Sequence, residues 1–119
     1  MKKRIVVIRP MEVPEVQYFD DKKDSLNDIV EGYLEAIYPF QAPHRALCLF
    51  VNEEGKLLHL PPNRVLTDQD GRVYDILQGN MCVVAHDSEG EMRDLTDEEV
   101  EAVFKRFGKR EMFVLDPDR

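Results

Sequence analysis

The stretch GKLLHLPPNRVL, from Gly55 to Leu66, determines how the rest of the chain is interpreted. An apolar run, Leu57–Leu60, is followed directly by Pro61 and Pro62. Proline fixes φ near about −65° and has no backbone N–H to donate, so it is poorly suited to the middle of a sheet. The pattern predicts that a strand ends at Leu60 and that a stiff turn comes after it.

Asn63 and Arg64 come directly after the two prolines, where no packing demand calls for them. A stiff turn holds its side chains in place, and the planar guanidinium of arginine matches a carboxylate or a phosphate. One interpretation is therefore a bound anion. The alternative is structural, with Asn63 satisfying backbone groups of the loop and Arg64 pairing with a nearby acid such as Asp75. The sequence leaves both interpretations open.

Apolar periodicity predicts the elements of the first half of the chain. Ile5–Ile8 is a continuous β-branched run, typical of a strand buried on both faces, and Val16–Phe19 alternates as a half-buried strand does. From Ser25 the period becomes helical, which predicts one helix from Ser25 to Ile37. Its apolar stripe consists of Leu26, Ile29, Val30, Tyr33, Leu34 and Ile37. Gly32 inside that helix indicates the close approach of another backbone, or of a ligand.

The second half reads as hairpins followed by a helix. Residues 46–51 and 57–60 are predicted to be strands joined by a glycine-containing turn, and further strands are expected at 73–77 and 81–85. Thr96 and Glu99 have the spacing of a capping box, and Gly108 follows a basic last turn. A helix is therefore expected between Thr96 and Gly108. A closing edge strand is expected at 112–115, followed by a frayed tail. Residues 113–119 therefore contain the end of that strand and the tail.

Together these elements predict a single α+β domain over residues 1–119. The sheet is expected to have about five or six strands and to be mostly antiparallel, because the connections are short. The two helices are expected to cover one face of it. A chain of 119 residues is long enough to bury a core of its own.

Composition limits the classes of function. The net charge of −8 disfavours direct binding to nucleic acid, and no apolar run is long enough for a membrane span or a secretory signal. A cytoplasmic protein is expected. Cys48 and Cys82 lie inside apolar runs without metal-site spacing and are interpreted as buried small hydrophobic residues.

No catalytic or metal-binding motif is visible. The histidines and cysteines match no family signature for a nucleophile, and neither HExxH, paired CxxC, a P-loop nor a dinucleotide fingerprint occurs. We therefore expect no metal, no cofactor and no catalytic residues.

Motifs along most of the chain resemble the domain-of-unknown-function 3846 family. The resemblance rests on E-G-K-L-x-x-L-P-x-N-R, a D-x-x-G turn, Tyr74-Asp-Ile-Leu-Gln-Gly79, Ile29-Val-Glu-Gly-Tyr33 and Leu95-Thr-Asp-Glu-Glu99. It extends from about Ile5 to Phe107. The matching positions are Gly32, Tyr33, Leu60, Pro61, Asn63, Arg64, Asp75 and Gly79. The resemblance implies a small protein of a bacteriophage or mobile element acting on host defence, without an established activity.

The sequence supports three functional hypotheses. The first is a non-enzymatic binding module, in the form of a homo-oligomer, that sequesters a small anionic ligand such as a nucleotide immune signal. Its expected ligand-binding residues are Pro62, Asn63, Arg64, Tyr33, Tyr74 and Asp75, with Tyr38 as a further stacking candidate. The second is an acidic inhibitor that binds a host defence enzyme. The third is an enzyme with Arg64 as anion stabiliser, for which no nucleophile or general base can be named.

Overall fold

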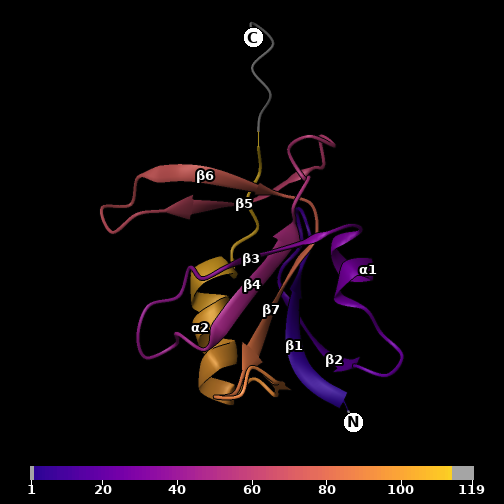
Figure 1. Ribbon diagram of the computed structural model, residues 1–119. Helices are drawn as coiled ribbons and strands as arrows, with labels where there is room; N and C mark the ends of the chain where they lie inside the picture. The colour runs from indigo at the N-terminus through magenta and orange to yellow at the C-terminus, as the bar shows by residue number, and fades with distance from the viewer. Residues whose placement is uncertain (1, 114–119) are drawn as a thin grey trace, which may run out of the picture.

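The structure is a computed structural model that describes residues 2–113. It contains two antiparallel sheets and two helices in one compact domain, which confirms the predicted α+β class, although β5 and β6 form a second sheet that was not expected (Figure 1). The elements in chain order are β1 (Lys2–Ile8), β2 (Glu15–Asp20), α1 (Leu26–Val30), β3 (Leu34–Ile37), β4 (Leu47–Asn52), β5 (Pro62–Thr67), β6 (Val73–Gln78), β7 (Met81–His86), β8 (Met92–Arg93) and α2 (Asp97–Phe107).

The larger sheet has the order β2-β1-β7-β4-β3, and the short strand β8 pairs with β7. β1 and β7 are inner strands and face each other with Val6 opposite Val83. Residues Ile5–Ile8 and Met81–Ala85 are almost completely buried, because apolar side chains cover both faces of the sheet at these strands. The prediction of a doubly buried strand at Ile5–Ile8 is confirmed.

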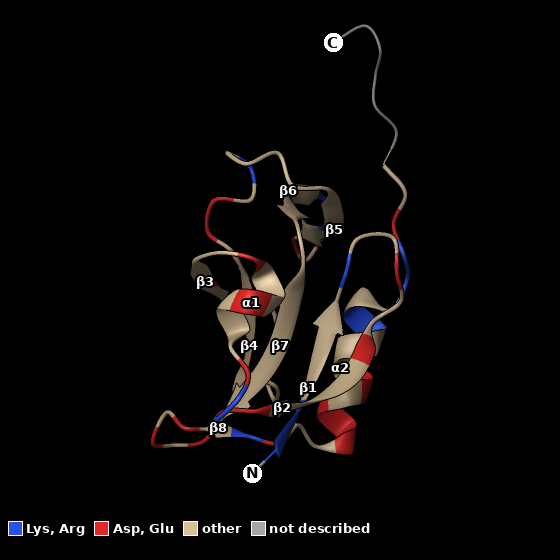
Figure 2. Cartoon of the chain, turned by 90° about the vertical axis from the view of Figure 1, so that its right-hand side faces the viewer, with Lys and Arg blue, Asp and Glu red and all other residues tan. Residues whose placement is uncertain are grey.

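The helices cover opposite faces of this sheet, not one face as expected. Val6, Ile8 and their neighbours pack with Val103 and Phe107 of α2. Ile5 and Val7 point to the other face, where Leu26 and Ile29 of α1 pack. Figure 2 shows α1 and α2 on the two sides of the strands. The sheet is covered on both sides because successive side chains of an inner strand alternate between faces, and both sets here are apolar.

The predicted helix from Ser25 to Ile37 is wrong beyond Val30. Ser25 caps the helix as expected, but Glu31 adopts a left-handed conformation with φ of 63° and ends it. The side-chain amide of Asn52 donates to the carbonyls of Val30 at 3.0 Å and Glu31 at 3.3 Å, satisfying carbonyl groups that a longer helix would use. The helix stops because a residue distant in sequence binds its end.

The remainder of the predicted helical stripe forms β3. Leu34 pairs with Asn52 and Ile37 with Leu49 of β4, so pairing with an existing strand overrides the helical period. Gly32 permits this crossover, because a Cβ at that position would lie 2.6 Å from Nδ2 of Asn52. The close approach predicted at Gly32 is thus made by a side-chain amide rather than by another backbone.

The predicted strand at 57–60 is also wrong, and the two prolines begin a strand instead of ending one. Residues 53–60 form a series of turns closed by bonds such as Leu58 N to Glu54 O at 2.8 Å and Leu60 N to Gly55 O at 3.0 Å. Pro62 is the first residue of β5, a position at which its missing donor costs no ladder bond. Asn63 and Arg64 therefore lie in a strand, not in a turn.

β5 and β6 form a two-stranded hairpin that projects from the larger sheet, seen at the upper left of Figure 1. Arg64 pairs with Leu77 near its base, and Thr67 with Val73 near its tip. Leu66 and Leu77 are buried in the same core as α2, so both strands anchor the hairpin to the domain. Of the predicted closing strand at 112–115, residues 112 and 113 are irregular and the others lie outside the described residues.

α2 matches its sequence signals closely. Thr96 and Glu99 form the predicted capping box, with Glu99 N donating to Thr96 Oγ1 at 3.1 Å and Thr96 N donating to Glu99 Oε1 at 2.9 Å. Arg93 donates to both carboxylate oxygens of Glu99, at 2.8 and 2.9 Å. The hydrogen bonds from Arg93, and next those from Thr96, hold the pKa of the buried Glu99 carboxyl at about 2, against the opposing effect of burial.

The depressed pKa of Glu99 predicts an acid-sensitive contribution to stability. An unfolded glutamate titrates near about 4.3, so as the pH falls below 5 the unfolded state takes up its proton first and becomes favoured. We expect Glu99→Gln to remove about 2 kcal/mol of this dependence between pH 5 and pH 2. Urea unfolding of both proteins across that range measures it, with Glu89→Gln as a control on an exposed loop. Parallel pH profiles for wild type and Glu99→Gln would contradict the assignment.

Candidate functional site

Arg64 is the largest fully buried side chain of the domain. Its Nε donates to the carbonyl of Phe107 at 3.0 Å, and its Nη2 donates to the carbonyl of Glu12 at 2.6 Å. Nη1 donates to the backbone oxygen of Asn63 at 3.0 Å and to its Oδ1 at 2.8 Å. One guanidinium therefore connects the hairpin, the end of α2 and the β1–β2 connection.

Asn63 extends this network to two more segments. Its Nδ2 donates to the carbonyl of Ile8, the last residue of β1, at 2.9 Å and to that of Gly79 at 2.8 Å. Asn63 is completely buried, and every buried side-chain nitrogen and oxygen in the described residues has a hydrogen-bond partner. We call Asn63 and Arg64 the base lock, because together they fix the base of the hairpin to the rest of the domain.

The base lock is electrostatically unusual because no carboxylate forms a salt bridge with Arg64 in residues 2–113. Burial lowers the pKa of the Arg64 guanidinium, and the charge of Glu111 raises it. Glu111 itself accepts the N–H of Val65 at 3.1 Å. The negative end of the α2 dipole, at the carbonyl of Phe107, supplies part of the compensation for the buried charge.

The guanidinium of Arg64 is buried, which disfavours a direct contact with a ligand. The ligand-binding role of Arg64 stays a prediction. The ion pair with Asp75 that the sequence offered as an alternative is not formed. Asp75 instead pairs with Lys56, and its Oδ1 accepts the N–H of Ile76 at 2.8 Å. Pro62 lies beside the lock at the start of β5 and is half-buried.

The base lock generates a stability prediction. Arg64→Met would leave the carbonyls of Phe107 and Glu12 without their donor, and we expect the free energy of unfolding to fall by about 3 kcal/mol or more. Arg64→Lys should also destabilise, because an ammonium cannot reproduce the planar fork. Urea denaturation at neutral pH is the measurement. The exposed Arg72 on the hairpin turn is the control, and Arg72→Met should change stability by less than about 0.5 kcal/mol. A stable Arg64→Met protein would contradict the structural role of the lock.

The two predicted tyrosines do not come together. Tyr33 is 68% exposed and lies beside the end of α1, where it lines a shallow hollow with Asn27 and Asp28. Tyr74 is 63% exposed and lies on β6 of the projecting hairpin. Of the six residues predicted for the ligand site, Tyr74 is the one that lines a broad groove between the hairpin and α2.

This groove has a volume of about 1300 Å³ and lies under the distal half of the hairpin. Three walls enclose it: the end of the hairpin, the segment that connects β3 to β4, and the exposed face of α2. We call it the hairpin groove. Its lining side chains include Tyr38, Phe40, His44, Tyr74, Glu98, Glu101, Lys105 and Arg106.

Contacts at the inner end of the hairpin groove fix its shape. Phe40 packs edge-to-face on Phe107, with ring centroids 5.9 Å apart. The guanidinium of Arg106 lies 5.6 Å from the centre of the Phe107 ring and donates to the carbonyl of Thr67 at 3.4 Å. Since Arg64 binds the carbonyl of Phe107, the base lock holds both the hairpin wall and the helix wall of the groove.

Charge is distributed unevenly along the helix wall. Lys105 and Arg106 occupy the last turn of α2, whereas Asp97, Glu98 and Glu99 occupy the first. Figure 2 shows the basic residues at the end of α2 nearer the hairpin and acidic residues along the remainder. The helix wall of the hairpin groove is therefore basic at its inner end, while Asp68 also lines the groove from the hairpin.

The two thiols are poorly suited to nucleophilic chemistry. Cys48 and Cys82 are both fully buried. Burial raises the pKa of Cys48, and burial together with the charge of Cys48 raises the pKa of Cys82 to about 12. The thiolate, which is the reactive form, is disfavoured at both positions. Within residues 2–113 no three His, Cys, Asp or Glu side chains are grouped so that they could hold a metal ion.

The sequence model of the family described as domain of unknown function (DUF3846) matches residues 1–108. The chain belongs to DUF3846. No curated protein and no solved structure matches the chain significantly. Neither helix in the described residues is long and apolar enough to cross a membrane.

Five of the eight DUF3846 motif residues recognised in the sequence, Leu60, Pro61, Asn63, Arg64 and Gly79, gather at the base of the hairpin. Gly79 has a φ of 84°, and a Cβ there would lie 2.7 Å from Cδ1 of Leu60. Its N–H donates to the carbonyl of Pro61 at 2.7 Å, and its own carbonyl accepts from Asn63. These motif positions therefore support the base lock, while the hairpin groove is lined largely by residues outside the motif.

Sequence reasoning missed most of the hairpin groove. Tyr38 and Tyr74 were considered as stacking residues, and Lys105 and Arg106 were interpreted as the basic last turn of a helix. No local pattern shows that these segments face one another, because their proximity depends on how the hairpin folds over α2. The aromatic residues Tyr38 and Phe40, on either side of Pro39, were a signal that the sequence did offer.

Proposed function

We propose that this DUF3846 protein is a non-enzymatic binding protein whose hairpin groove takes a small anionic ligand with a flat ring, such as a nucleotide. The observation that carries the proposal is that two exposed tyrosines and two cations from separate segments line one groove. The site is moved from the position predicted at Asn63 and Arg64, because those side chains are used inside the domain.

The tyrosines supply surfaces for a ring. Tyr38 is 66% exposed and Tyr74 is 63% exposed, and both line the groove, one from the β3–β4 connection and the other from β6. Stacking of a base on an aromatic side chain contributes about 1–3 kcal/mol and tolerates different bases. Exposed aromatic side chains in a concave site are a common feature of small-molecule recognition.

The cations supply contacts for the anionic group. Lys105 and Arg106 are exposed, and neither forms a salt bridge within residues 2–113. A helix end repels an anion through its dipole, but here the buried Arg64 binds the final carbonyl of α2 and offsets that effect. Lys105 and Arg106 therefore remain available for a phosphate or carboxylate.

The buried, protonated thiols support binding rather than catalysis as the function of this domain. The setting that we propose is the one implied by the family resemblance, a phage or mobile-element protein in the host cytoplasm that sequesters a nucleotide immune signal. A homo-oligomer remains part of this proposal.

The proposal predicts selective stabilisation by nucleotides. We expect one class from a panel of linear and cyclic nucleotides to raise the Tm, and we expect the Lys105→Gln/Arg106→Gln double variant to lose the rise, because a bound ligand stabilises the folded state. Tyr74→Ala should weaken the same response. Thermal-shift measurements and then calorimetric titration provide the test.

The matched control is Lys109→Gln/Arg110→Gln, which removes the same charge from exposed positions outside the groove. It should retain the full response. A flat response of wild type to the whole panel, or equal loss in the two double variants, would contradict a nucleotide site in the hairpin groove.

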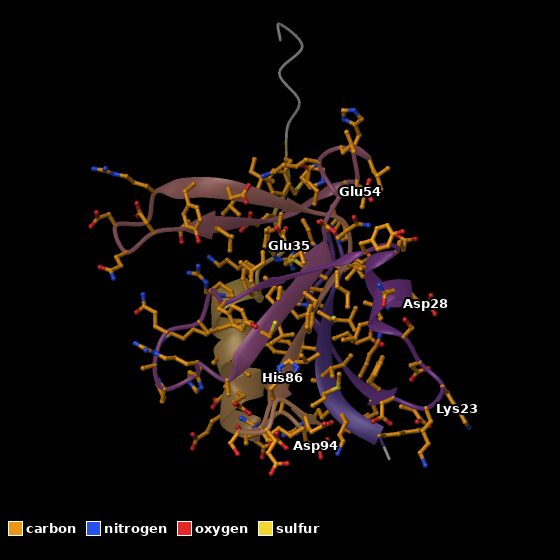
Figure 3. All side chains as sticks on the ribbon, in the orientation of Figure 1. Lys23, Asp28, Glu35, Glu54, His86 and Asp94 are labelled. Carbon is orange, nitrogen blue, oxygen red and sulfur yellow. The ribbon has the colours of Figure 1, made fainter. Side chains whose placement is uncertain are left out.

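A second candidate function is the inhibition of a host defence protein by direct binding, favoured by the loop after β4. Leu57 and Leu58 are 74% and 53% exposed there, on a loop whose backbone is internally hydrogen-bonded. Glu53 and Glu54 precede them, and Figure 3 shows Glu54 at the opposite end of the molecule from Asp94. Rigid apolar anchors beside acidic residues suit an apolar pocket with a basic rim.

This candidate predicts a partner whose affinity falls with rising salt. We expect Leu57→Ser/Leu58→Ser to abolish capture of a host protein, while the groove variants retain capture. The measurement is a pull-down from host lysate, with titration of the identified partner at low and high salt. Capture that persists in the leucine variant, or that is insensitive to salt, would contradict docking through this loop.

A further inference from the structure

The β5–β6 hairpin is a two-stranded sheet, and within residues 2–113 neither strand pairs with a third one. Val65 and Ile76 lie directly opposite each other near its middle. In antiparallel pairs, alternate residues direct their N–H groups away from the partner strand. Here the N–H of Val65 donates to Glu111 Oε2 at 3.1 Å, and the N–H of Ile76 donates to Asp75 Oδ1 at 2.8 Å. Each edge of the hairpin thus carries a carboxylate on a backbone donor.

The two edges differ in what else lies against them. Beside β5, Arg106 of α2 donates to the carbonyl of Thr67 at 3.4 Å, and Glu111 belongs to the segment that follows the helix. The end of α2 and that segment therefore cover the edge of β5. At the edge of β6, the loop after β4 reaches Asp75 through its ion pair with Lys56. In the part of the chain that the structure describes, β6 has the more open edge.

β6 also exposes three large apolar side chains. Val73 is 57% exposed, Tyr74 63% and Ile76 39%. An open edge with apolar side chains is a template for another strand, and natural proteins block such edges with charged side chains. A second copy of β6 offers the same donors and acceptors, so antiparallel pairing about a two-fold axis is self-complementary. The strand that this edge fits is therefore its own counterpart.

We infer that Asp75 is an edge cap, which prevents β6 from pairing with β6 of a second copy. Its carboxylate occupies the N–H of Ile76, a donor that the incoming strand would need. Asp75 is also the third of the six residues of β6, so pairing about a two-fold axis would bring two Asp75 side chains close together. Like charges at such positions destabilise a sheet.

The edge cap keeps one wall of the hairpin groove free. Tyr74 lines the groove and belongs to β6, so pairing along β6 would place a second domain beside this side chain. The inference does not depend on which ligand the groove binds. It implies that a homo-oligomer of the wild type forms through a different surface.

The competing interpretation is that Asp75 only anchors the loop after β4 through Lys56. Loss of such an anchor changes stability and leaves the molar mass unchanged. Lys56→Met removes the anchor and retains the carboxylate at Ile76, so it is a matched control. Asp70→Ala removes the same charge as Asp75→Ala from an exposed position on the hairpin turn and is a second control.

The experiment measures molar mass by light scattering after size-exclusion chromatography, over a range of protein concentrations. Asp75→Ala should rise towards about twice the wild-type mass as the concentration increases. Asp75→Asn should associate less than Asp75→Ala, because its amide oxygen can still accept the N–H of Ile76. Both controls should keep the wild-type mass. Circular dichroism shows that each variant is folded, and Asp75→Val, which suits a strand, replaces an alanine variant that does not fold.

A further variant locates the contact. Asp75→Ala/Ile76→Lys places a lysine on the edge, which should restore the wild-type mass because a charged edge resists pairing. An unchanged mass of folded Asp75→Ala and Asp75→Val would overturn the inference. So would association that persists in the lysine variant, or equal association of Lys56→Met. None of these results affects the test of nucleotide binding.

Discussion

The buried charge of Arg64 is the constraint on which the rest of the structure depends. A guanidinium removed from water must have its donors satisfied, and here backbone carbonyls and the amide of Asn63 satisfy them without a salt-bridged carboxylate in the described part of the chain. The carbonyls of Phe107 and Glu12 belong to segments distant in sequence, so the positions of these segments are fixed relative to one another. The hairpin, the end of α2 and the connection after β1 are therefore held by a single side chain that makes no contact with solvent.

The same constraint shapes the hairpin groove. Because Arg64 binds the carbonyl of Phe107, the ring of Phe107 is placed to receive Phe40 on one side and the guanidinium of Arg106 nearby. The helix dipole is offset from inside the domain, and the exposed cations of the last turn are left facing the groove. Structural and binding charges are thus divided between neighbouring segments, with Arg64 inside and Arg106 at the surface.

The sequence predicted the elements that begin or end because of neighbouring residues. It did not predict those whose limits are determined by residues distant in the chain. The start of α2 was predicted because Thr96 and Glu99 cap it through neighbouring residues. The helix at Ser25 was extended wrongly because its stop is provided by Asn52, from the next part of the sheet. Pro61 and Pro62 were correctly interpreted as a strand boundary but assigned to the wrong side of it. The groove was missed for the same reason, since Tyr38, Tyr74 and Lys105 meet only through tertiary structure.

The position of the base lock divides the hairpin into a firmly held base and an adaptable tip. The contacts that bury the hairpin lie at or before Leu66 and after Asp75, whereas the turn between Thr67 and Tyr74 is mainly exposed and touches the domain through few bonds. A turn of this kind tolerates exchange of its residues, and insertions, at little cost in stability. The residues of one wall of the groove can therefore be replaced independently of the core, by natural variation or by loop grafting.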